Sequence, residues 1–231
     1  MAYSLAVALA KRGLEVGILD VDLTGPNLTD ILGKKELDVV DDRFVPETAK
    51  GMRYVSLGQI ASEGDPVLWS GKDLESAARQ LLERTDWGNL DYLVVDFPPG
   101  SASEPQALLP LMDYALIVTV PSILAESNVR RVIEMCRETQ TPILGLIKNM
   151  TKIACPNCGS TFEVFPEDHS FEDLGIPTLI EVPLQPKIAE RKVINNFVVE
   201  PILRAMEHPV VLKKKPHLRA KLLKILLKLT S

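Results

Sequence analysis

The sequence predicts a doubly wound α/β fold, with a mostly parallel sheet that is covered by helices on both faces. Three observations carry this prediction: short apolar runs that end in acidic or polar residues, amphipathic stretches at helical spacing, and regular alternation of the two. Strands buried on both faces read as continuous apolar runs, and helices connect such strands when they are parallel. The chain has 231 residues, of which 46% are hydrophobic, so it is long enough for one main core.

The elements follow one another along the chain. An apolar stretch from Leu5 to Leu9 has helical spacing and ends at Gly13, a typical C-terminal cap. Strands are then expected at 15–20, 52–58, 91–96, 114–120 and 142–150, and helices at 72–85, 104–112 and 127–139. Two insertions break this alternation, a polar stretch at 34–51 and a cysteine-bearing segment at 151–166.

The charge distribution separates a body, residues 1–208, from a basic tail, residues 209–231. Residues 213–231 hold seven Lys or Arg and no acid, which is a charge of +7. Since the net charge of the whole chain is −5, the rest of the chain carries −12. An acidic body argues against nucleic-acid binding. The tail predicts an amphipathic helix with leucines opposite lysines. It could lie on an anionic membrane surface, dock on an acidic partner or pack back on the body.

The sequence favours a cytoplasmic location. Lys11 and Arg12 follow the N-terminal apolar run, whereas a signal peptide has its positive charges before that run. No apolar stretch reaches the roughly 18 to 20 residues of a membrane-spanning helix. There are three cysteines, two of them in one CxxC pair, which favours a reducing compartment over a disulfide framework.

Polar residues just after the strands are the first functional candidates, because ligands bind beyond the carboxyl ends of parallel strands. Asp22 follows the first strand together with Asp20, and either acid could position a water molecule or a magnesium shell. Asp96 ends a later strand and precedes a Pro-Pro-Gly turn, where Gly100 could meet a terminal phosphate. For these acids, the alternative is a turn in which they cap a helix. Asn149 could contact an adenine edge through its side-chain amide.

Cys155 and Cys158 have the spacing at which two thiolates face one metal. One pair supplies two ligands, whereas a zinc site or a cubane cluster takes four, and a symmetric dimer would supply the other two. Structural zinc completed by His169 and a redox dithiol are the alternatives. Cys136, on the apolar face of a predicted helix, is expected to be a packed core thiol.

Several sequence blocks together resemble the Mrp/ApbC-type iron–sulfur cluster carrier ATPases, which belong with the MinD-like and nitrogenase-iron-protein-like deviant P-loop ATPases. The blocks run in order from about residue 5 to residue 191: LAVALAKRGLEVGILDVDLTGPNLTDILG, VLWSGKD, DWGNLDYLVVDFPPG, IVTVPS, GLIKNMTKIACPNCGSTFEVF and TLIEVPLQPKIAE. The resemblance implies a homodimer that binds ATP with Mg²⁺, holds a [4Fe–4S] cluster between its subunits and hands the cluster to apo-proteins.

The resemblance also implies roles for single residues, most of them at strand ends. By resemblance, Asp22 would be the switch acid that positions the attacking water, Asp96 would support magnesium, and Gly100 would contact a phosphate. Asn149 would contact adenine, and Pro183 and Leu184 would line the base pocket. Cys155 and Cys158 would ligate the cluster.

The sequence departs from the family pattern at Thr24, where the family has an aromatic residue, and in two further places that bear on ATP hydrolysis. The family opens with a strand and a KGGVGK[ST] phosphate-binding loop, which do not precede the first helix here, and Ser103 stands where the family has an acid. Both departures argue against ATP hydrolysis by the sequence as given. We favour a start at an internal methionine over a natural short form that keeps the scaffold and the thiols. The rival functions are a MinD/ParA-like membrane-associated positioning ATPase and a zinc or cluster binder without nucleotide.

Overall fold

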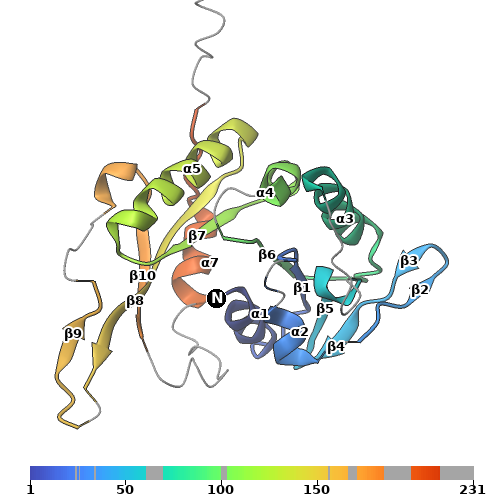
Figure 1. Ribbon diagram of the computed structural model, residues 1–231, viewed down its shortest axis with the longest axis horizontal. Coiled ribbons are helices and arrows are strands. Elements are labelled where there is room, and N and C mark those ends of the chain that lie inside the picture. Colours follow the sequence, from blue (N-terminus) through green and yellow to red (C-terminus); the bar gives the residue numbers. More distant parts are fainter. Residues whose placement is uncertain are drawn as a thin grey trace, which may run out of the picture.

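Two mainly parallel sheets with helices packed around them form the body of the molecule (Figure 1). The computed structural model describes residues 1–23, 25, 27–33, 35–60, 70–99, 103–155, 157–165, 171–184 and 199–213. Within these ranges, no helix is long and apolar enough to cross a membrane. The parallel strands and covering helices confirm the predicted α/β class.

The first sheet has the strand order β4–β5–β1–β6. Its centre is β1 (Val16–Asp20), which pairs in parallel with β5 (Met52–Ser56) on one side and with β6 (Tyr92–Asp96) on the other. All five residues of β1 are buried, as expected for a strand covered on both faces. The three strands end at the same level, because Asp20 is in register with both Ser56 and Asp96.

The insertion at 34–51 is largely β structure. β4 (Glu47–Ala49) pairs antiparallel with β5 at the edge of the first sheet. β2 (Val39–Val40) and β3 (Arg43–Phe44) form a separate two-stranded hairpin, which projects beyond β4 in Figure 1.

Helices cover both faces of the first sheet. α1 (Ala2–Ala10) and α2 (Asn27–Leu32) pack on one face, against side chains such as Ile18. On the other face, Leu19 packs against α3 (Gly71–Arg84) and α4 (Ser103–Leu108). Neighbouring residues of β1 thus face opposite layers, as the pleat of a strand requires.

The second sheet has the order β10–β8–β7, and all three strands are parallel. They are β7 (Ala115–Thr119), β8 (Ile143–Ala154) and β10 (Thr178–Leu184). β8 is 12 residues long and extends past its neighbours to pair antiparallel with β9 (Thr161–Glu163). The β8–β9 hairpin projects from the body (Figure 1).

α5 (Ile123–Thr139) packs on one face of the second sheet, where Val129, Ile133 and Cys136 are buried. α7 (Val199–Glu207) packs on the other face through Ile202. Leu5 of α1 contacts both this core and that of the first sheet. The α1 and α7 layer therefore joins the two halves of the molecule.

The facing edges of the two sheets are not joined by a strand among the described residues, since β6 pairs with β1 and β7 pairs with β8. β6 is accordingly half-buried along its length, and Val118 in β7 is 41% exposed. The single sheet expected from the sequence is thus divided in two. The structure also contains β10 and α7, which the periodicity did not single out.

Candidate functional site

Acidic residues gather at the carboxyl ends of β1 and β6. Asp20 is 2% exposed and accepts hydrogen bonds from the backbone N–H of Asp22 (3.0 Å) and of Leu28 (3.4 Å). The hydroxyl of Ser56 donates a third hydrogen bond to it (3.1 Å). Asp22, in turn, accepts a hydrogen bond from the N–H of Gly25 (3.0 Å). Asp20 therefore fixes the loop that carries the predicted switch acid.

Burial and neighbouring negative charges raise the pKa values of Asp20 and Asp96 at this edge. Burial raises the pKa of Asp20 from 3.8 to about 6, and the charge of Asp96 adds to this rise, whereas hydrogen bonds from Asp22, Ser56 and Leu28 oppose it. Burial also raises the pKa of Asp96, the charge of Asp22 adds to that rise, and the amino group of Met1 lowers it. A cation bound here would relieve this repulsion, because an opposite charge favours the ionised carboxylates.

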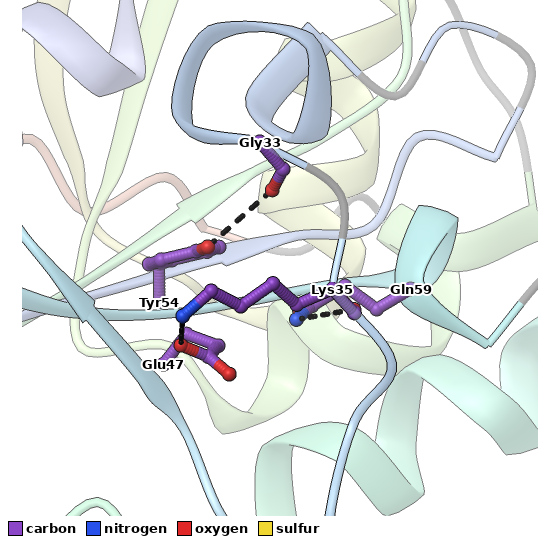
Figure 2. A network of polar contacts seen from close by, with 5 residues as sticks. All are labelled: Gly33, Lys35, Glu47, Tyr54 and Gln59. Atoms are coloured by element: carbon purple, nitrogen blue, oxygen red, sulfur yellow. Dashed lines mark hydrogen bonds and ion pairs between the residues drawn. The ribbon is translucent and has the colours of Figure 1, made fainter.

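A second set of polar contacts fixes the chain after α2 to the first sheet (Figure 2). The hydroxyl of Tyr54 donates to the carbonyl of Gly33 (3.4 Å), and Gln59 Nε2 donates to the carbonyl of Lys35 (3.2 Å). Lys35 also forms an ion pair with Glu47 in β4 (2.7 Å). The segment from Asp22 to Lys35 is thus attached to the sheet at both ends.

The predicted base-pocket residues lie on the second sheet. Asn149 in β8 is half-buried and is in register with Val182 of β10, and the half-buried Pro183 and Leu184 end that strand. The structure therefore brings Asn149 next to the two β10 residues. Gly100, the predicted phosphate contact, lies outside the described residues.

A small polar hollow is lined by residues of β8, β9 and β10. Its lining includes Lys148, Lys152, Glu163 and Glu181, and its volume is about 60 Å³. Lys148 Nζ lies 3.7 Å from a carboxylate oxygen of Glu181. Sites for small organic ligands typically measure about 300–1,000 Å³, so this hollow is too small to hold a nucleotide.

The two predicted metal ligands lie at the tip of the β8–β9 hairpin. Cys155 is half-buried, Cys158 is exposed, and both thiols are free. The N–H of Cys155 donates to the carbonyl of Ser160 (2.8 Å), and the N–H of Gly159 donates to the carbonyl of Cys155 (2.9 Å). This backbone knuckle brings both cysteines to one turn, as shared metal ligation requires.

The environments of the cysteines differ sharply. A hydrogen bond with the Ser160 hydroxyl is the main cause that lowers the pKa of the Cys158 thiol, and contacts with the Ser160 backbone and Cys155 add to it. Burial raises the pKa of the Cys136 thiol to about 11. Cys136 is 1% exposed in the α5 core, which confirms its prediction as a packed core thiol.

The described part of the chain holds no group of three or more His, Cys, Asp and Glu side chains that could bind a metal. His169, the candidate zinc ligand, lies outside that part, as do residues 214–231 of the predicted basic tail. At the start of the predicted tail, Val210 exchanges backbone hydrogen bonds with Ile143 (2.8 Å each). The body therefore extends at least to Val210.

Several polar residues at these sites carry no distinctive signal in the sequence. Ser56 is fully buried, Lys148 is 6% exposed, and Glu104 in the first turn of α4 is 4% exposed. Each is a common residue type at the end of an apolar run or the start of a helix. Only the pairing of the strands brings Ser56 to Asp20.

The parallel sheets, with acids at the carboxyl edge of the first one, define an α/β protein with the architecture of nucleotide-binding folds. A nucleotide-binding protein from Archaeoglobus fulgidus, solved in complex with ADP, is 28% identical and superposes with a TM-score of 0.67. The match covers 93% of this chain and 87% of the archaeal one.

The family follows from the sequence match. Residues 1–208 match the model of the NUBPL iron-transfer P-loop NTPases of the ParA group. The chain belongs to this family.

Two curated relatives have names that refer to iron–sulfur clusters. The iron-sulfur cluster carrier protein of Deinococcus radiodurans is 35% identical over 81% of this chain, and the chain spans 55% of its length. The cytosolic Fe-S cluster assembly factor Nubp2 homolog of Anopheles gambiae is 34% identical over 82% of this chain, which spans 79% of that protein.

Proposed function

We propose that this protein carries an iron–sulfur cluster on Cys155 and Cys158 and hands it to apo-proteins. The observation that carries the proposal is the pair of free cysteines held by a backbone knuckle at the tip of a projecting hairpin. Thiolates are the usual ligands of such clusters. The family and the names of the relatives support the proposal.

We further propose that the cluster is a [4Fe–4S] cluster shared by two copies of the chain. A single chain offers two thiols at the hairpin, and a two-fold axis beside the hairpin tip would bring four together. The exposed tip leaves room for a second copy. We also propose that the protein is located in the cytoplasm, in line with the word cytosolic in the name of the Anopheles relative.

Nucleotide binding is the third part of the proposal. Asp22 and Asp96 would face a magnesium–nucleotide complex from the carboxyl edge of the first sheet, and Asn149, Pro183 and Leu184 would contact the base from the second. Asp22 would position the attacking water in any hydrolysis, which would rest on charge stabilisation and positioning. Calorimetric titration with magnesium–ADP tests this part, and an Asp96→Asn variant is expected to weaken binding that depends on magnesium.

Anaerobic reconstitution with iron and sulfide tests the central proposal. The wild-type protein is expected to bind both and to show thiolate-to-iron charge-transfer absorption, whereas the Cys155→Ala/Cys158→Ala double variant should remain colourless. Cys136→Ala is the matched control, because it removes a thiol from the core and leaves the hairpin intact. A colourless wild-type protein that holds zinc would contradict the carrier function and make the thiols structural.

A further inference from the structure

Ser160 contacts both cysteines of the hairpin, in two different ways. Its carbonyl accepts the N–H of Cys155 (2.8 Å), and its hydroxyl oxygen lies 3.3 Å from the sulfur of Cys158. The backbone contact is independent of the side chain, so it persists in any variant that keeps the turn. The hydroxyl contact is specific to the serine and acts on Cys158, the more exposed of the two thiols.

A hydroxyl beside a metal-bound sulfur has a defined chemical effect. When the sulfur is a thiolate, the hydroxyl donates the hydrogen bond, and a bond to an ionised acceptor is stronger than one to a neutral acceptor. Such a bond draws electron density from the sulfur, which weakens the sulfur–iron bond and stabilises the thiolate that leaves.

We infer that Ser160 is a positioning residue that makes Cys158 the first cluster ligand to be released during transfer. The inference rests on the proposed carrier function. A thiolate of the acceptor forms a new bond to iron while the bond from iron to Cys158 breaks. Cys158 leaves with its electron pair as a thiolate that accepts the Ser160 hydrogen bond. The iron keeps the same number of thiolate ligands, and the cluster is neither oxidised nor reduced.

The two cysteines are suited to different parts of this exchange. Cys158 is exposed at the tip, where an incoming thiol can reach the iron that it holds. Cys155 is half-buried, and its backbone N–H and carbonyl both take part in the knuckle. It therefore retains the cluster while the first bond is exchanged.

Three variants separate the hydroxyl from the rest of the turn. Ser160→Ala removes the hydroxyl, Ser160→Thr keeps it, and Thr161→Ala removes the neighbouring exposed hydroxyl of β9 as a matched control. Each protein is loaded with cluster, and the rate of transfer to a synthetic four-cysteine peptide is measured per bound cluster, together with the reduction potential of the cluster. Ser160→Ala is expected to slow transfer by about three- to tenfold and to lower that potential. Ser160→Thr and Thr161→Ala should behave as the wild type.

The outcomes separate the inference from the function beneath it. Full loading of Ser160→Ala with an unchanged transfer rate would overturn the inference and leave the carrier function standing. A wild-type protein that takes up no cluster would overturn both. In every case, the redox equilibrium of the Cys155 and Cys158 thiols with glutathione measures the effect of the Ser160 hydroxyl on Cys158 directly. Loss of the hydroxyl should favour the disulfide by about threefold, which is about 14 mV for a two-electron couple.

Discussion

Asp20, at the end of β1, is 2% exposed and accepts hydrogen bonds from three other residues, whereas Cys158, at the tip of the β8–β9 hairpin, is exposed. Asp20 belongs to the centre of the parallel sheet. Cys158 belongs to a short antiparallel extension beyond the core. The two candidate sites thus differ in how strongly they are tied to folding.

This difference matches what each site would have to do. A site for a magnesium–nucleotide complex depends on acids held in fixed positions, which is achieved by burial and hydrogen bonding. A site that passes on a cluster has to be reached by the acceptor's thiols. Changes at the carboxylates should therefore alter stability, and changes at the hairpin should alter reactivity.

Thiol labelling should show the largest contrast. With an aromatic disulfide reagent, Cys155 and Cys158 should react in the folded protein. Cys136 is 1% exposed, so it should react only when the core opens. Opening of a core element is rare, so its labelling should be slower by at least about 1,000-fold. In strong denaturant all three thiols should react at similar rates. Fast labelling of Cys136 in the folded state would contradict the predicted separation of core and hairpin.

Truncation of Asp20 should have the next largest effect. Asp20→Ala leaves the Ser56 hydroxyl and the N–H of Leu28 buried without their acceptor, and we expect a loss of about 3 kcal/mol in the free energy of unfolding. Chemical denaturation measures it. The Cys155→Ala/Cys158→Ala double variant is the comparison, with an expected midpoint equal to that of the wild type. Equal losses in the two proteins would remove the distinction between the sites.

Much of the scaffold could be predicted from the sequence, because its apolar runs are strong signals. The run 15–20 became β1 and the amphipathic stretch 127–139 lies within α5, since burial on two faces and on one face leave different periods. β10 was missed because the segment TLIEVPL has polar residues at exposed positions and a proline near its end. α7 was missed because its apolar residues share only one face of a short helix.

The candidate sites were predictable only in part. The CxxC spacing is local, so the sequence alone placed Cys155 and Cys158 in one turn. The importance of Asp20 depends on Ser56, 36 residues further along the chain, and no local pattern indicates that contact. The hydroxyl of Ser160 is two residues from Cys158, but a serine after a glycine is common in turns and gives no sign of the direction of its side chain.

A glycine in β8 allows a smaller test of the core. Gly145 has a φ of +154°, and a Cβ there would lie 2.7 Å from the carbonyl oxygen of Pro177. That carbonyl is fixed because it accepts the N–H of Leu146 (2.8 Å). Gly145→Ala should therefore cost about 2 kcal/mol in unfolding free energy. Gly13→Ala is the control with positive φ but open space, and it should cost about 1 kcal/mol. A smaller loss at Gly145 than at Gly13 would contradict this account.

The dependence of stability on pH isolates the charge of Asp20. Burial raises its folded-state pKa from 3.8 to about 6, so between these values the folded state binds more protons than the unfolded state. Stability should then fall as the pH rises from about 4 to about 6 and change little above that, with a total loss of about 3 kcal/mol. Asp20→Asn cannot ionise, so its stability should fall less over the same range. The difference between the two proteins, measured by denaturation at several pH values, cancels the contribution of most other acids. Parallel curves would contradict the raised pKa of Asp20 in the folded protein.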